Sequence, residues 1–368
     1  MQRDDFRAQL SVPARKILMT ISAYDHPFLS GLLGDDETAS YFSAQADIRA
    51  MLGFEAALAK AKAVHGLISH EAARHIGTVC ATFEPDVLHL RAATARDGVV
   101  VADLVKQLRK AVGSPYSDCV HLGATSQDVI DTSLMVRLKA IAFLFSSRLS
   151  QLATAFDDLD AQFGKNVLMG RTRMQAAIAI TVSDRLRAWS APLGGYRDRL
   201  TQQRFPVQFG GAAGTLDKLQ DHAPAIRAAL AQELGLSDTP QWQSQRGIIA
   251  DFANLLSLIS GSLGKFGQDI ALLAQAGDEI ELAGGGGSSA MAHKQNPVAA
   301  EALVALARFN ATQLSGCHQS LVHEQERSGA AWMLEWLILP QMVMATAASL
   351  RLALELAGHI KRIGQRNS

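Results

Sequence analysis

The sequence predicts an all-α protein built from long helices packed into a bundle. Proline, the strongest helix breaker, is absent from three long stretches, 116–191, 241–296 and 298–339. Within them apolar residues recur at spacings of three and four, as at Leu255, Leu258 and Ile259. Few stretches alternate as strands do, and aromatic residues make up only 6% of the chain. This composition favours closely packed helices.

Breaks in the helical pattern divide the chain into three parts. Residues 1–113 form an N-terminal helical domain with a first long helix near 48–65, and the break GSPYSD begins at Gly113. Residues 114–351 form the central long-helix bundle, interrupted by loops near 165–173, 205–217 and 284–297, and 352–368 remain as a short C-terminal remnant. Because helices of this length cannot bury every apolar side within one subunit, we expect the bundle to mediate oligomerisation.

Charge and cysteine content exclude several classes of protein. Lys and Arg total 35, as do Asp and Glu, so no overall field attracts nucleic acid or an anionic membrane surface. Cys80, Cys119 and Cys317 are far apart and lack CxxC spacing, which favours a reducing, cytoplasmic location over a disulfide frame or a zinc site. The histidines show no metal-binding spacing, and we expect neither a metal nor an organic cofactor.

Four consecutive glycines, Gly284–Gly287, mark the most unusual segment. Glycine raises the entropy lost on ordering and supplies no side chain, so packing does not account for them, and we expect a mobile loop. Hydroxyls, a cation and an amide follow at once in SSAMAHKQNP, a combination suited to closing over an anionic ligand. The Walker spacing of a P-loop is absent. A flexible linker with incidental serines is the simpler alternative.

The segment GSSAMAHKQNP resembles the GSSxMPxKxNP signature of the fumarase/aspartase superfamily, with Ala292 where that pattern has proline. The resemblance implies that Ser288 and Lys294 are catalytic, with Ser288 exchanging a proton with the carbon next to a substrate carboxylate. It also implies that Lys294 and Asn296 bind carboxylate, and Ser289 joins them as a binding residue. A serine alkoxide needs a site that favours the anion, and Lys294 and nearby backbone N–H groups would supply it.

A second motif, HLGATSQDVIDT, leads from a small-residue turn into a helix. Thr125 and Ser126 offer hydroxyl and N–H groups at the helix start, where a carboxylate binds well, although an ordinary helix N-cap has the same pattern. The segment resembles the TSxD region of the superfamily. The resemblance implies that Thr125, Ser126 and Asp128 bind substrate, with His121 beside them.

A third motif, GRTRMQ, resembles the GRTHxQ region in which adenylosuccinate lyase keeps a catalytic histidine, here replaced by Arg173. An amine or hydroxide leaves poorly unless a general acid protonates it, whereas a carboxylate, with an acid pKa of about 4, needs no such help. The substitution therefore favours a reaction in which a carboxylate attacks or departs, with Arg173 and Gln175 binding it. A structural salt bridge is the alternative role of Arg173.

Three further segments are similar to the 3-carboxy-cis,cis-muconate cycloisomerases of the superfamily: FSAQADIRAMLGFEAALAKA, FGGAAGTLDKL and HEQERSGAAWMLEWLILP. In the last, Arg327 is positioned to bind a carboxylate. The resemblance covers residues 42–340. It implies a bundle of the fumarase/aspartase type with a short or missing C-terminal lobe, and a homotetramer whose active sites are shared between subunits.

Together these features predict a cofactor-free cycloisomerase with a small tricarboxylate as its only substrate. The reaction would convert 3-carboxy-cis,cis-muconate to 4-carboxymuconolactone, in the protocatechuate branch of the β-ketoadipate pathway, by intramolecular carboxylate addition and proton transfer. One alternative is a lyase of the adenylosuccinate or argininosuccinate type, which releases fumarate. Another is a catalytically silent helical scaffold.

Overall fold

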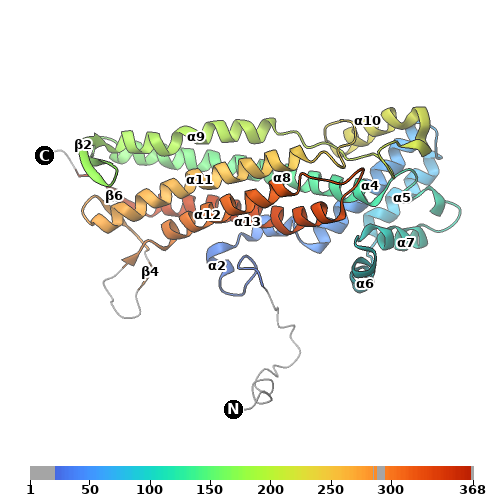
Figure 1. The fold of residues 1–368 in the computed structure, drawn as a ribbon, viewed down its shortest axis with the longest axis horizontal. Coiled ribbons are helices and arrows are strands. Elements are labelled where there is room, and N and C mark those ends of the chain that lie inside the picture. The colour runs from blue at the N-terminus through green and yellow to red at the C-terminus, as the bar shows by residue number, and fades with distance from the viewer. Residues whose placement is uncertain (1–20, 285, 288–294, 366–368) are drawn as a thin grey trace, which may run out of the picture.

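The computed structural model describes residues 21–284, 286–287 and 295–365, and it confirms an all-α helical bundle (Figure 1). The helices are α2 (Ser30–Leu33), α3 (Asp36–Ser40), α4 (Ala44–Val64), α5 (His70–Thr82), α6 (Val87–Asp97), α7 (Val101–Val112), α8 (Ser126–Phe163), α9 (Val182–Gln202), α10 (Ala223–Leu234), α11 (Gly247–Ala276), α12 (Val298–Gln319) and α13 (Gly329–Gly358), with short 3-10 helices η1 (Ser117–Cys119) and η2 (Asp217–His222). The strands are β1 (Val167–Thr172), β2 (Gln175–Thr181), β3 (Ile280–Leu282), β4 (Gly286–Gly287), β5 (Gln295–Asn296) and β6 (Ile360–Ile363).

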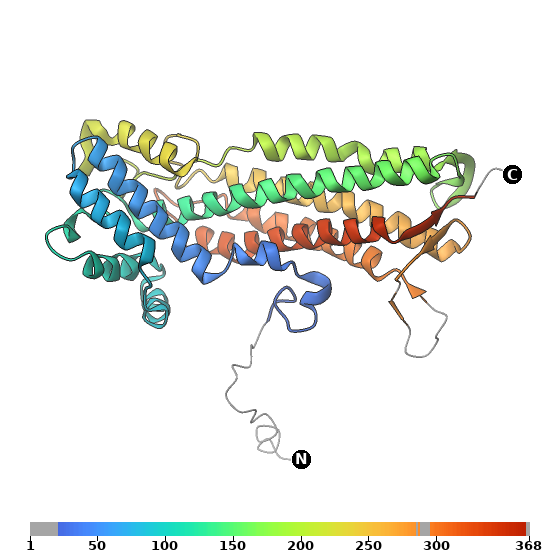
Figure 2. The ribbon, with the colours of Figure 1, turned by 180° about the vertical axis from the view of Figure 1, so that it is seen from behind.

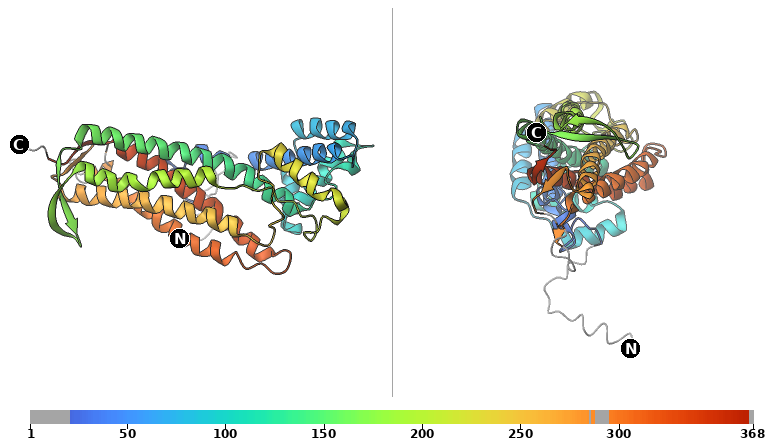
Figure 3. Two further views of the ribbon diagram at one scale, coloured as in Figure 1. Left: turned by 90° about the horizontal axis from the view of Figure 1, so that it is seen from above. Right: turned by 90° about the vertical axis from the view of Figure 1, so that its left-hand side faces the viewer.

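Five long helices, α8, α9, α11, α12 and α13, run alongside one another and form an elongated bundle (Figures 2 and 3). One hydrophobic core runs through it, and its aromatic centre is Phe156, Trp189 and Phe266. The Trp189 and Phe266 rings meet edge to face with centroids 4.9 Å apart. Helices α9 and α13 continue through Pro192 and Pro340. The neighbouring side chains Leu193 and Leu339 are buried, and this core packing offsets the hydrogen bond that each proline removes.

A second core joins the N-terminal helices to a segment from much later in the chain. Helix α10 packs against α4, and Ile226 and Leu230 are buried with Phe54 and Leu58. The chain therefore leaves the bundle after α9, covers the N-terminal helices and returns as α11. Residues 114–351 thus contribute to both cores. No helix ends near 351, since α13 runs on to Gly358.

Three two-stranded antiparallel pairs, which the sequence did not predict, accompany the helices in the described residues; β3 and β6 are far apart in the chain and do not form a hairpin. Strands β1 and β2 pair at one end of the bundle, β3 pairs with β6, and β4 pairs with β5. Packing does account for one of the consecutive glycines, contrary to our expectation. A Cβ atom on Gly286 would lie 2.5 Å from Cγ2 of Val298, so only glycine fits there.

Two of the described helices, α11 and α13, are long and apolar enough to cross a membrane by length and composition alone. Within their most apolar windows, 56% and 72% of the residues are buried inside the protein. Much of this apolar surface therefore serves the bundle core.

A close approach of α11 to α12 supplies a test of this packing. A Cβ atom on Gly267 would lie 2.7 Å from the carbonyl oxygen of Ala300 and 2.8 Å from Cβ of Leu303. We expect Gly267→Ala to lower the free energy of unfolding by about 1–3 kcal/mol, because two helices must move apart. Gly261, exposed on the same helix with open space around it, is the matched control. Gly261→Ala should raise the free energy of unfolding by about 0.5–1 kcal/mol. Equal stability of the two variants in urea unfolding would contradict this packing.

Candidate active site

The N-terminus of α8 forms the centre of the candidate site. Thr125 is the N-cap residue, and its backbone N–H donates to Oδ2 of Asp128 at 3.0 Å in a capping box. Thr125 and Ser126 are half-buried, as is His121 in the preceding turn. Thr125 and Asp128 thus form the ordinary helix N-cap that was the alternative interpretation of this motif. It also leaves a helix N-terminus, with its partial positive charge, at a half-buried position.

Asp128 is fully buried, and its observed contacts are all with protein donors. Oδ1 accepts hydrogen bonds from the N–H of Gly210 at 2.9 Å and from Nε2 of Gln208 at 3.1 Å, while Oδ2 accepts from the N–H of Gly211 at 3.0 Å. Burial raises the pKa of Asp128 to about 6, against the opposing effect of these donors. Asp128 therefore fastens the glycine-rich segment at 209–211 to the start of α8. Direct contact with substrate stays a prediction.

Arg327 brings a third segment to this end of the protein. Its Nε donates to Oε1 of Gln127 at 2.9 Å, and its Nη2 donates to the carbonyl of Ala212 at 3.4 Å. Gln127 is itself fixed, because its Nε2 donates to the carbonyl of Gln243 at 2.8 Å. Nη1 of Arg327 has no hydrogen bond among the described residues, and the side chain is exposed. A guanidinium held in this way beside a helix N-terminus is suited to binding a carboxylate.

A buried ionic cluster connects the helices next to these segments. Arg246 donates to Asp131 of α8 at 2.5 and 3.0 Å and to Glu335 of α13 at 2.6 and 2.9 Å. Its guanidinium also lies 4.5 Å from the ring centre of Trp242, and Trp332 donates from Nε1 to Asp131 at 3.1 Å. The ionic cluster was not predicted from the sequence. A lone arginine and two acids far apart in the chain carry no local signal.

Two of the predicted binding residues lie toward the opposite end of the bundle. Arg173 and Met174 form the tip of the β1–β2 hairpin, both with positive φ, and Gln175 begins β2 (Figure 1). Arg173 has no ion pair among the described residues. The structural salt bridge that was its alternative role is therefore not observed in this part of the chain. It lines a hollow of about 730 Å³ together with three more cations, Arg171, Arg185 and Lys265, and one carboxylate, Asp269, which pairs with Arg185 and Lys265. This hollow is suited to anions.

Of the predicted site residues in the glycine-rich loop, the structure describes only Asn296. Asn296 belongs to β5 and pairs with Gly286 on a hairpin set apart from the start of α8. Ser288, Ser289 and Lys294 lie outside the described residues. Within one described chain, therefore, His121, Thr125, Ser126 and Arg327 come together, whereas Arg173, Gln175 and Asn296 do not join them.

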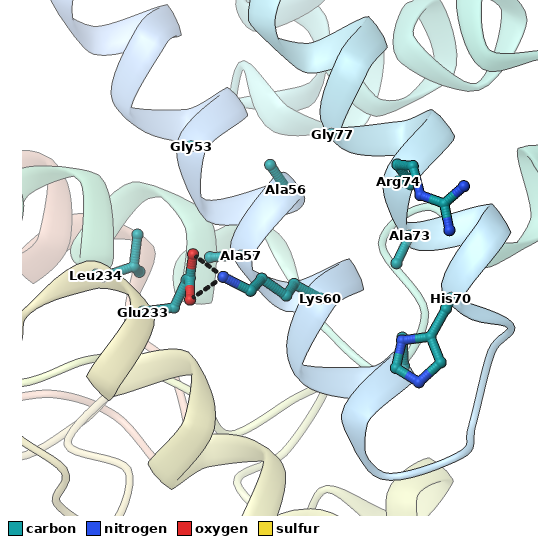
Figure 4. A pocket seen from close by; sticks show the side chains of 11 residues that line it. Gly53, Ala56, Ala57, Lys60, His70, Ala73, Arg74, Gly77, Glu233 and Leu234 are labelled. Carbon is teal, nitrogen blue, oxygen red and sulfur yellow. Dashed lines mark hydrogen bonds and ion pairs between the residues drawn. The ribbon is translucent and has the colours of Figure 1, made fainter.

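A separate pocket of about 470 Å³ opens between α4, α5 and α10 (Figure 4). Small residues line it, and the exposed ion pair of Lys60 with Glu233, 2.7 Å apart, closes one side. None of the predicted site residues that the structure describes lines this pocket. Among the described residues no group of three His, Cys, Asp or Glu side chains is placed to hold a metal ion.

Comparison with known proteins identifies relatives over most of the chain. Residues 34–310 match a family model described as lyase. A 3-carboxy-cis,cis-muconate cycloisomerase of Pseudomonas aeruginosa is 38% identical over 336 residues, which cover 88% of this chain and 73% of that protein. The crystal structure of 3-carboxy-cis,cis-muconate lactonizing enzyme from Pseudomonas putida superposes with a TM-score of 0.85 at 35% identity, over 91% of this chain and 77% of that one. A fumarate lyase structure from Mesorhizobium sp. BNC1 gives 0.83 at 29% identity, over 90% and 76%.

The contacts of Asp128 supply the second test. An amide in place of the carboxylate keeps one acceptor and turns an NH₂ group toward backbone N–H donors. We therefore expect Asp128→Asn to lower the free energy of unfolding by about 2–4 kcal/mol. Asp184 has the same place in the capping box of α9 but is exposed, so Asp184→Asn should cost much less. Chemical denaturation of both variants measures the difference, and equal losses would refute the fastening role of Asp128.

Proposed function

Because this chain belongs to the lyase family, within the fumarase/aspartase superfamily, we propose that it is a cycloisomerase converting 3-carboxy-cis,cis-muconate to 4-carboxymuconolactone. The observation that carries the proposal is Arg327, held by Gln127 and Ala212 beside the N-terminus of α8, with no hydrogen bond to Nη1 from the described part of the chain. This end of the protein offers a cation, a helix dipole and hydroxyls to a substrate with several carboxylates.

The proposed chemistry needs only the substrate and one proton. One carboxylate oxygen of the muconate adds to a conjugated double bond, and the displaced electron pair moves to the carbon next to another carboxylate. Ser288 gives that carbon its proton, and in the reverse direction the Ser288 alkoxide removes it. Lys294, Asn296, Thr125 and Ser126 stabilise the charge that develops on the neighbouring carboxylate. Because addition is intramolecular, positioning supplies much of the rate.

Arg173 separates this proposal from its main competitor. A lyase that releases fumarate from a succinyl compound needs a general acid for its amine or hydroxide leaving group. A guanidinium does not release a proton at neutral pH, so Arg173 is unsuited to that task and suited to binding a carboxylate. Its position at the tip of an exposed hairpin, among other cations, agrees with that role.

We also propose that the working enzyme is a cytoplasmic homotetramer of the β-ketoadipate pathway, with active sites shared between subunits. The support is geometric. Arg173 and Gln175 lie on a hairpin toward the opposite end of the bundle from Ser126, so a site containing both groups needs more than one copy of the chain. Exposed apolar side chains on that hairpin, Met174 and Ile178, favour a partner surface.

The decisive assay follows the loss of conjugated-diene absorbance from 3-carboxy-cis,cis-muconate, with adenylosuccinate and argininosuccinate as competing substrates. The proposal expects rapid loss with the muconate and no fumarate from the other two. Fumarate release without muconate turnover would instead support the lyase.

The proton-transfer role of Ser288 is tested by Ser288→Ala. We expect turnover to fall by at least about a thousandfold, because the variant has no group to protonate the carbon. Circular dichroism and the oligomeric state should stay unchanged, since one hydroxyl is removed. Turnover at the wild-type rate would eliminate Ser288 as the proton donor.

The binding role of Arg327 is tested by Arg327→Lys. A single ammonium cannot hold Gln127, Ala212 and a substrate carboxylate in the geometry of a guanidinium, so we expect KM to rise about tenfold or more. Arg96, exposed on α6 and paired with Asp97, provides the control Arg96→Lys, which should leave KM unchanged. A wild-type KM for Arg327→Lys would show that this guanidinium does not bind substrate.

A further inference from the structure

Helix α4 carries two buried charges on the face toward the turn that precedes α8. Glu55 and Lys62 are 2% and 0% exposed, and they lie seven residues apart, about two turns along one side of the helix. Burying a charge is costly unless a partner compensates it. The partners of both side chains lie in the turn at 119–122, where His121 is found.

Lys62 clamps the backbone on both sides of His121. Its Nζ donates to the carbonyl of Cys119 at 3.0 Å and to the carbonyl of Leu122 at 3.2 Å. Arg109 of α7 donates from Nη2 to the carbonyl between them, that of Val120, at 3.1 Å. Burial lowers the pKa of Lys62 to about 8, against the opposing charge of Glu55. Lys62 and Arg109 together hold the backbone of the turn at 119–122.

The backbone of His121 is in an unfavourable conformation, with φ of 61°. A residue with a Cβ atom rarely adopts this left-handed region, and surrounding contacts must hold it there. Glu55 supplies the side-chain contact, because its Oε1 lies 2.6 Å from Nδ1 of His121. The other oxygen of Glu55, Oε2, is buried and has no partner among the described residues. Among the described residues, His121 is therefore the only hydrogen-bond partner of the Glu55 carboxylate.

The Glu55 contact determines which nitrogen of His121 is available. A carboxylate on Nδ1 keeps a proton on that nitrogen and fixes the orientation of the ring, leaving Nε2 as the free position. Nε2 has no hydrogen bond among the described residues, and the side chain is 14% exposed. The turn also adjoins the segment that Arg327 contacts, since a Cβ atom on Gly211 would lie 3.2 Å from the carbonyl oxygen of Gly123.

We propose that Glu55 is a positioning residue, which holds His121 through Nδ1 so that Nε2 hydrogen-bonds substrate at the N-terminus of α8. When both ring nitrogens carry protons, Nε2 donates to a substrate carboxylate while Glu55 balances the charge. The inference rests on the proposed function for the identity of the substrate. The contact between Glu55 and His121 does not depend on it.

The test compares Glu55→Gln, His121→Asn and the double variant in the muconate assay. We expect Glu55→Gln to lower kcat/KM about ten- to a hundredfold, as for the loss of one charge-assisted hydrogen bond. The double variant should be no worse than His121→Asn alone, because Glu55 acts through His121. Additive losses would overturn the proposal, since they indicate two independent roles. The control is Glu233→Gln, which removes the carboxylate paired with Lys60 on the other side of α4 and should leave kcat/KM unchanged (Figure 4).

A second measurement is independent of turnover. Nitrogen-15 spectra of the histidine rings, with the His121 signals assigned by their loss in His121→Asn, report which nitrogen carries the proton. Glu55→Gln should shift both His121 nitrogens. If Glu55→Gln does not fold, Glu55→Asp keeps the charge but withdraws it from Nδ1, and the same shift is expected. Wild-type nitrogen shifts in a folded Glu55 variant would overturn the proposal. If the wild type does not turn over muconate, the proposed function fails, while these spectra still decide the role of Glu55.

Discussion

The geometry of the candidate site depends on one buried guanidinium. Arg246 directly precedes α11 and bridges Asp131 on α8 and Glu335 on α13, so three helices are connected at the end where Ser126 begins α8. The side chains of Arg246, Asp131 and Glu335 are buried. Moving one helix away from the others would leave a buried charge without its partner, which is energetically costly. The rigidity of this end of the bundle follows from that constraint.

Above this cluster, buried polar contacts fix segments that have no regular structure. Asp128 fastens Gly210 and Gly211 to α8, Gln127 orients Arg327, and Glu55 with Lys62 holds the turn containing His121. Main-chain groups in loops must be satisfied when they are buried, and these side chains satisfy them. A substrate that enters here would meet groups already in place, which lowers the cost of ordering them on binding.

The other described binding groups, Arg173, Gln175 and Asn296, lie on hairpins away from this centre. Arg173 is presented on a two-residue turn at the tip of β1–β2, and Asn296 lies on the short β4–β5 pair. Long helices separate these groups by the length of the bundle, with Arg173 toward one end and Arg327 at the other. In the oligomer proposed above, association of chains would bring the two ends together.

Sequence alone determined the all-α class, because proline-free stretches with spacings of three and four allow little else. It also supplied the candidate site segments, since the GSS, TSxD and GRTRMQ motifs are local, and their roles stay predictions. It did not reveal that α10 returns to the N-terminal helices or that a hairpin carries Arg173. Nor did it reveal Glu55, Lys62 and Arg246, which within their own helices are ordinary charged residues. Only tertiary structure decided their roles, because a buried charge is defined by partners far away in the chain, such as Asp131 and Glu335 for Arg246.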